Sequence, residues 1–111
     1  MARVGLGEFE HIVLAAILRL RPDAYGMTIR REILERTGQD ASIGAVYTTL
    51  DRLEAKGLCE FRIGEPTEER GGRRKKYVEI TASGVDALQA SVERLSNMWD
   101  GVPGLKPAGV S

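Results

Sequence analysis

The sequence predicts a mainly helical domain that carries one small β-hairpin. Apolar residues recur at helical spacing in four separate segments. Apolar and polar residues alternate over 58–63, as in a half-buried strand. A turn-rich, charged stretch at 64–72 then leads to a second strand over 74–80. The predicted order is therefore helix, helix, helix, hairpin, helix.

Length and charge limit the classes of protein to consider. With 111 residues the chain is one domain, or one domain and a tail. Sixteen Lys and Arg residues balance sixteen Asp and Glu residues, which excludes a uniformly basic coat but not a local basic patch. The longest apolar run, 12–18, is far shorter than the roughly 20 residues of a membrane span. We therefore expect a cytoplasmic protein with no membrane partner.

The inventory of reactive side chains argues against an enzyme or a metal site. Cys59 and His11 are the single cysteine and histidine, and a structural zinc needs about four ligands, so carboxylates would have to supply the rest. No catalytic set of histidine with cysteine or serine can be placed, because His11 stands alone on an apolar helix. We expect no cofactor and no catalytic activity, an inert core thiol at Cys59 and a packed or interface histidine at His11.

The first helix is predicted over 7–20. Glu8 and Glu10 suit the positive end of its dipole. Leu14 and Leu18 widen the apolar stripe until little polar face remains, which is typical of a helix buried on several sides. In so small a domain, this wide apolar stripe favours a second subunit that covers part of the helix. The stripe itself consists of Phe9, Ile12, Val13, Ala16, Ile17 and Leu20.

Pro22 ends the first helix, and a second helix fits residues 25–36, with Gly38 at its C-terminal cap. Its inward side chains are predicted to be Ile29, Ile33 and Leu34.

Ser42 is a good N-cap for a third helix that Gly57 ends. The predicted core face of this helix is Ile43, Val46, Leu50 and Leu53. The opposite face has only small or polar groups apart from one arginine, namely Gly44, Ala45, Thr48, Thr49 and Arg52.

The last helix begins at Thr81 and carries apolar residues at alternating spacings of three and four, as in a coiled-coil seam. Two heptads are too short to hold a dimer alone, so the first helix must contribute. We predict a first unit over 1–80, a dimerisation helix over 81–100 and a flexible tail over 101–111. The seam consists of Val85, Leu88, Val92, Leu95 and Trp99.

Two helices joined by a turn and followed by a hairpin form the plan of a winged helix-turn-helix domain. Its third helix enters the major groove of DNA, which requires a narrow outer face. Residues 62–76 hold six basic and three acidic side chains, concentrated in the Gly-Gly-Arg-Arg-Lys-Lys run at 71–76. Such cations can neutralise phosphates. Taken separately, the basic run at 71–76 could also be a solvated turn. The small residues of the third helix could also be exposed by chance.

Three motifs together carry a family resemblance over about residues 6–99. They are Tyr25-Gly26, the run from Ser42 to Leu50, and Gly-Gly-Arg-Arg-Lys-Lys-Tyr at 71–77. On these residues the sequence resembles the PadR-like transcriptional regulators, in the short form with one C-terminal helix. It departs from the family at Val78, where a second aromatic residue is frequent, and we interpret this as a packing change. Gly26 is expected to allow close helix approach, and Tyr25 to pack under the domain.

The resemblance implies a dimeric bacterial repressor that binds an inverted repeat in double-stranded DNA. Helix positions that match the family's DNA contacts are Ser42, Gly44, Tyr47, Thr48 and Arg52, and we add Thr49 from the small face. In the wing they are Arg73, Arg74, Lys75 and Lys76. Tyr47 would contact phosphate through its hydroxyl while its ring is partly packed.

The resemblance also implies a homodimer that pairs the C-terminal helix with the first helix of the partner. The expected contacts are Phe9, Val13, Val85, Leu88, Val92, Leu95 and Trp99. Some short members bind flat aromatic compounds there, so Leu95, Met98 and Trp99 become candidate effector-binding residues, although Trp99 also suits plain dimer packing. The main alternative function is a winged-helix protein-interaction module without DNA binding, which the zero net charge and Glu65, Glu68 and Glu69 favour.

Overall fold

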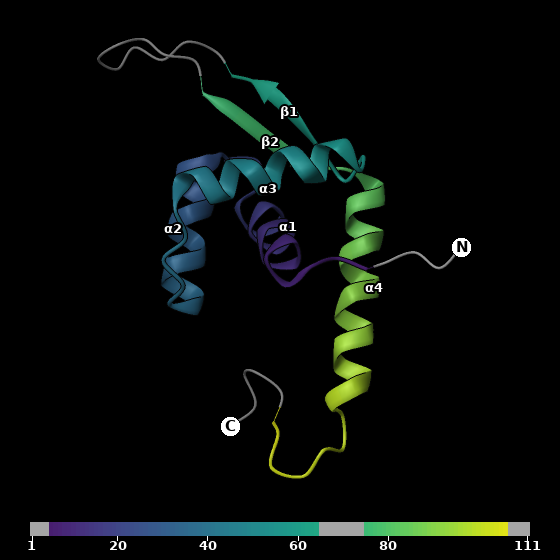
Figure 1. The fold of residues 1–111 in the computed structure, drawn as a ribbon. Helices are drawn as coiled ribbons and strands as arrows, with labels where there is room; N and C mark the ends of the chain where they lie inside the picture. Colours follow the sequence, from purple (N-terminus) through teal and green to yellow (C-terminus); the bar gives the residue numbers. More distant parts are fainter. Residues whose placement is uncertain (1–4, 65–74, 107–111) are drawn as a thin grey trace.

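The computed structural model describes residues 5–64 and 75–106, and its element order is the predicted one. In Figure 1, α1 lies at the centre of the body, with α2 on its left, α3 above it, α4 on its right and the hairpin beyond α3. The elements are α1 (Glu8–Leu20), α2 (Gly26–Thr37), α3 (Ile43–Ala55), β1 (Cys59–Ile63), β2 (Lys76–Ile80) and α4 (Ala82–Trp99).

Helix α1 is the centre of the core because it is apolar on nearly every side. It contacts α2, α3, α4 and β2, and it buries Val13, Leu14, Ala16 and Ile17. Its first turn is closed by Glu10, whose carboxylate accepts a hydrogen bond from the Gly7 amide at 2.9 Å. The chain itself therefore supplies much of the cover that the sequence attributed to a second subunit.

Helix α2 ends where Gly38 adopts the left-handed conformation, with φ at 76° and its amide donating to the Leu34 carbonyl. Ile29 and Ile33 are buried against α1, as predicted. Leu34 is exposed, so the expectation that it faces inward is wrong. The reason is geometric, because each residue turns a helix by about 100° and Leu34 lies one step beyond the buried stripe.

Helix α3 begins at the predicted cap, where the Ser42 hydroxyl accepts a hydrogen bond from the Ala45 amide at 3.0 Å. Val46, Leu50 and Leu53 are buried, as predicted. Ile43 was expected on the same face but is exposed, because it occupies the first turn at the edge of the core.

The hairpin pairs β1 and β2 antiparallel, from Cys59 opposite Ile80 to Ile63 opposite Lys76. Thr81 then caps α4 by accepting a hydrogen bond from the Gly84 amide at 3.0 Å. Gly84 packs so closely on the Leu58 carbonyl oxygen that a Cβ atom at position 84 would collide with it. This contact fixes the start of α4 against the root of the hairpin.

The second half of α4 leaves the body of the domain (Figure 1). The buried residues of α4, Gly84, Leu88 and Ser91, all lie between its start and its middle. Within residues 5–64 and 75–106, no helix combines the length and apolar character needed to cross a membrane.

Candidate nucleic-acid interface

The outer face of α3 consists of short side chains. Ser42, Gly44, Ala45 and Thr48 are exposed, with Arg52 further along the helix. Thr49 was expected on this face, but only 6% of it is exposed, so that expectation is wrong. Its position three residues after Val46 and four before Leu53 places it beside the buried stripe. Thr49 therefore leaves the candidate contact set.

Gly44 sits in open space at the start of this face. A Cβ atom built there would meet only the Ser42 hydroxyl oxygen, at 3.9 Å. Alanine would therefore fit the domain, and internal packing gives no reason for glycine at this position. A close approach by an external partner would supply one.

Tyr47 is half-buried, and its ring lies against the first residue of α2. A Cβ atom at Gly26 would come within 2.6 Å of the Tyr47 ring carbon Cζ and hydroxyl oxygen. The close approach expected at Gly26 is confirmed, and its partner is Tyr47. The packed ring also matches the expectation for Tyr47, while a phosphate contact by its hydroxyl stays a prediction.

Arg30 holds the turn that leads into α3. Its Nε donates to the Ala41 carbonyl at 2.7 Å, and its Nη2 donates to the Asp40 carboxylate at 2.9 Å. Both bonds act on the two residues just before the Ser42 cap. Periodicity gives no signal for this role of Arg30, because its partners lie ten and eleven residues further along the chain.

The root of the wing has two described cations of the predicted set, and each lies over an aromatic ring. The Lys75 ammonium is 4.9 Å from the Tyr25 ring centre, and the Lys76 ammonium is 4.1 Å from that of Phe61. Arg73 and Arg74 lie outside the described residues. In the sequence Arg62 is one of the six basic residues of the wing segment. In the structure its guanidinium carbon lies 4.7 Å from the Tyr77 ring centre.

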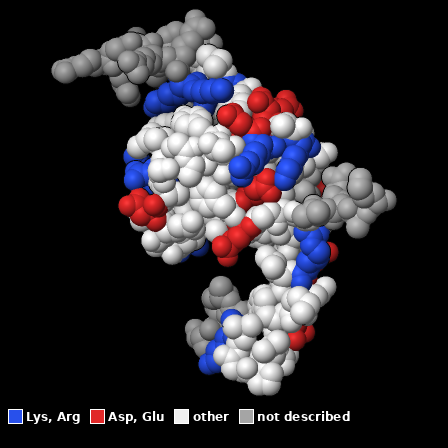
Figure 2. All heavy atoms as spheres, in the orientation of Figure 1, with Lys and Arg blue, Asp and Glu red and all other residues white. Residues whose placement is uncertain are grey.

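Lys and Arg side chains occur in several places on the described surface, and one group of them lies at the hairpin. Figure 2 shows Lys and Arg side chains gathered beside the grey segment at the hairpin, with Asp and Glu side chains close to them. Arg62 itself pairs with Glu79, at 2.8 Å. The described surface therefore carries Lys and Arg side chains at the hairpin, with acidic side chains among them.

The model of the transcriptional regulator PadR-like family matches residues 13–90. The chain belongs to the PadR-like family. PadR-like proteins are transcriptional regulators that bind DNA, so this chain is a regulator and not an enzyme. No curated protein matches the chain.

Solved structures support the winged-helix fold of this PadR-like chain. A PadR family regulator from Clostridium difficile aligns over 84% of this chain and 98% of its own, with 24% identity and a TM-score of 0.65. A PadR family regulator from Eggerthella lenta aligns over 86% and 82%, with 24% identity and a TM-score of 0.66. RosR from H. salinarum aligns over 86% and 79%, with 25% identity and a TM-score of 0.65.

The predicted dimer contacts divide into two groups in this PadR-like chain. Val13 is 0% exposed and Leu88 7% exposed, so both pack in the core of a single chain and their assignment to a dimer surface is wrong. The reason is that α1 and α4 contact each other within one chain. Val85, Val92 and Leu95 are exposed, while Phe9 and Trp99 are half-buried. Met98, a candidate effector-binding residue, is exposed as well.

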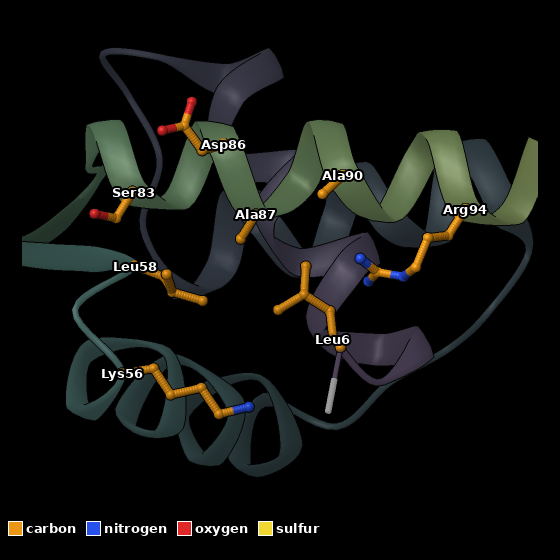
Figure 3. A pocket seen from close by; sticks show the side chains of 9 residues that line it. Leu6, Lys56, Leu58, Ser83, Asp86, Ala87, Ala90 and Arg94 are labelled. Atoms are coloured by element: carbon orange, nitrogen blue, oxygen red, sulfur yellow. The ribbon is translucent and has the colours of Figure 1, made fainter. Parts of the chain in front are cut away.

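Two hollows lie against α4, one beside the end of α3 and the other beside α1. The first has a volume of about 650 Å³, and Figure 3 shows the head groups of Lys56 and Arg94 pointing toward Leu6 from opposite sides. Lys56 already pairs with Glu10 at 2.7 Å. Burial alone would raise the pKa of Glu10, but hydrogen bonds from Lys56 and Gly7 outweigh it and lower that pKa. The second hollow has a volume of about 530 Å³ and reaches Leu95.

His11 and Cys59 are structural in this chain. The His11 Nδ1 atom is 2.7 Å from the Ser91 hydroxyl oxygen, which ties α1 to α4, and burial lowers the pKa of His11. Burial, followed by the nearby carboxylates of Glu54, Asp51 and Glu60, raises the pKa of Cys59 to about 12. The packed histidine and the buried thiol agree with the sequence. Among the described residues, no three metal-ligating side chains gather into a cluster.

Proposed function

We propose that this chain is a repressor that binds an inverted-repeat operator as a homodimer, with α3 in the major groove and the wing on the phosphate backbone. The outer face of α3 carries the proposal. Its exposed residues are short, and open space surrounds Gly44. The major groove reveals base edges only to a helix whose backbone comes close, so a short-sided face is what binding requires.

Each contact residue has a role that its chemistry allows. The hydroxyls of Ser42 and Thr48 can reach bases or phosphates, and Arg52 can reach phosphate or guanine. The Tyr47 hydroxyl would bind phosphate, since its ring is held against α2. The proposed wing contacts are Arg73, Arg74, Lys75 and Lys76.

A second copy is proposed to cover the outer face of α4 together with Phe9 of α1. The support is the apolar surface that the single chain leaves open, with Val92 42%, Leu95 53% and Met98 80% exposed. Exposed apolar groups on adjacent turns of one helix are typical of a protein–protein contact. Two copies related by a twofold axis would present two α3 helices to the two halves of an inverted repeat.

We further propose that a flat aromatic compound releases the operator by binding at Leu95, Met98 and Trp99. The second hollow, which reaches Leu95, supports this proposal. Trp99 is the single tryptophan of the chain, so its fluorescence reports on this site alone. Titration with planar aromatic dyes should quench that fluorescence and raise the operator dissociation constant. Absence of quenching would leave Trp99 as a dimer-packing residue, and quenching without any change in operator binding would contradict release of the operator by the bound compound.

The repressor proposal is tested by fluorescence anisotropy on a labelled duplex that carries the promoter of the chain's own gene. An unrelated duplex is the control, and both titrations are run at two salt concentrations. We expect preference for the promoter duplex and a steep loss of affinity with salt, because phosphate contacts release counterions. Absence of binding even at low salt would contradict the proposal and favour a protein-interaction module.

A further inference from the structure

We infer that Tyr25 and Gly26 are positioning residues that fix the wing relative to α3, so that operator specificity depends on a contact that does not touch DNA. The inference rests on the proposed DNA-binding function. The two neighbouring residues meet two different elements, since Tyr25 contacts β2 and Gly26 contacts the Tyr47 ring of α3. We call this group the joint, and it consists of Ala24, Tyr25, Gly26, Tyr47 and Tyr77.

The first half of the joint is a backbone connection between the wing root and the chain before α2. Tyr25 and Tyr77 form an isolated antiparallel bridge, and the Val78 amide donates to the Ala24 carbonyl at 2.8 Å. The hairpin has only two strands, so this bond occupies an edge of β2 that would otherwise lack a backbone partner. The bridge therefore attaches the wing to the body of the domain at a defined register.

The second half is a row of rings and cations. The Tyr25 and Tyr77 rings meet edge to face, with centres 5.6 Å apart and planes at 86°. Lys75 lies over the first ring and Arg62 over the second, at 4.9 Å and 4.7 Å. Arg62 also pairs with Glu79 at 2.8 Å. The row thus orients two cations at the root of the wing by their ring contacts.

Gly26 connects Tyr25 to α3, because it packs against a side chain of that helix. Since a Cβ at position 26 would come within 2.6 Å of the Tyr47 ring, α3 packs against the very residue that follows Tyr25. One path from the wing to α3, besides the direct contact of β1 with α3, therefore runs through the rings of Tyr77 and Tyr25, the peptide unit that joins Tyr25 to Gly26, and the Tyr47 ring. Contacts made by α3 and by the wing must be satisfied on one duplex at the same time, and a loose element loses that simultaneous fit.

The test compares Tyr25→Leu, which removes the ring, with Tyr25→Phe, which keeps it. Phe61→Leu is the matched control, because Phe61 is also half-buried and carries Lys76 over its ring. Phe61 lies opposite Val78 in the hairpin, but the Val78 amide donates to Ala24 and not to Phe61, so the control leaves the hydrogen bond of the joint in place. Two readouts are used. The first is hydrogen exchange of the Val78 amide by NMR, and the second is the ratio of dissociation constants for unrelated and promoter duplexes.

We expect Tyr25→Leu to speed Val78 exchange by about tenfold while amides in α1 keep their protection. The ratio of dissociation constants should fall by about tenfold, because specific fit suffers more than phosphate attraction. Tyr25→Phe should keep both the Val78 exchange rate and the ratio of dissociation constants at the values of the unaltered chain. Phe61→Leu should leave both unchanged, even if it weakens binding to the two duplexes alike.

Unchanged Val78 exchange in Tyr25→Leu would overturn the inference, whether or not the chain binds DNA. Faster exchange with an unchanged ratio would also overturn it, because the joint would then be irrelevant to specificity. Absence of DNA binding by the unaltered chain would instead contradict the proposed function, and the exchange measurement would still decide whether Tyr25 holds the wing root.

Discussion

The outer faces of α3 and α4 are both left open by a single chain, and their chemistry is opposite. On α3 the exposed side chains of Ser42, Ala45 and Thr48 are short, and a Cβ atom at Gly44 would have room. On α4 they are long and apolar, with Leu95 53% exposed and Met98 80% exposed. The first face suits a partner that must approach the backbone closely, as DNA does, and the second suits another apolar surface. Exposure alone thus says little, whereas the kind of side chain exposed identifies the class of partner.

The largest expected effect separates the two sides of α4. Leu88→Asp places an unpaired charge in the core, and we expect a loss of more than about 4 kcal/mol in unfolding free energy. Val92→Asp changes an exposed residue and should leave the single chain folded while abolishing the dimer. Thermal unfolding and sedimentation measure the two outcomes. A folded dimer in both variants would show that the dimer contact lies elsewhere.

The next effect compares two glycines near α3. Gly26→Ala forces a Cβ into the Tyr47 ring, and we expect a loss of about 1–3 kcal/mol in unfolding free energy. Gly44→Ala has room for its methyl group and should stabilise the chain by about 0.5 kcal/mol, because alanine favours helix. Its operator affinity should nevertheless fall about tenfold, measured by anisotropy. Unaltered affinity in Gly44→Ala would contradict the role of the open space.

A smaller effect concerns pH and the contact between α1 and α4. Burial lowers the pKa of His11 in the folded chain below its ordinary value of 6.5. The unfolded chain therefore binds a proton first as pH falls, so stability is complete above pH 6.5 and decreases below it. Urea unfolding on either side of pH 6.5 should show this decrease, and His11→Asn should reduce it. An identical pH dependence in the variant would assign the effect to other groups.

The smallest effect is at Cys59. Because its thiol is buried and its pKa is raised to about 12, we expect no reaction with iodoacetamide at neutral pH in the folded chain. Reaction should occur after unfolding in urea. Mass spectrometry measures both results, and rapid modification of the folded chain would contradict the burial of this residue.

Much of the fold was predictable because its local signals agree. Helical spacing, the Ser42 cap and the alternation around Cys59 each marked an element that the structure contains. The sequence also placed small residues on α3 and apolar residues on α4. The errors at Thr49, Val13 and Leu88 share one cause. Periodicity identifies an apolar or small stripe, but it does not say which part of the stripe is covered by the same chain.

Other features of the site depend on contacts between distant residues. Arg30 reaches the turn before α3, and Tyr25 meets Tyr77, which lies 52 residues further along the chain. Neither contact leaves a periodic signal, because each joins elements through a single pair of side chains. Tyr25-Gly26 was visible as a motif, but its two partners became evident only from the packing of β2 and α3.

The central claim is that DNA contacts the outer face of α3, and amide chemical shifts on addition of the promoter duplex test it most directly. We predict the largest shift changes at Ser42, Gly44 and Thr48, with further changes at Lys75 and Lys76. Residues of the outer face of α4, such as Val92, should change little. Changes concentrated on α4, with α3 unaffected, would contradict the claim.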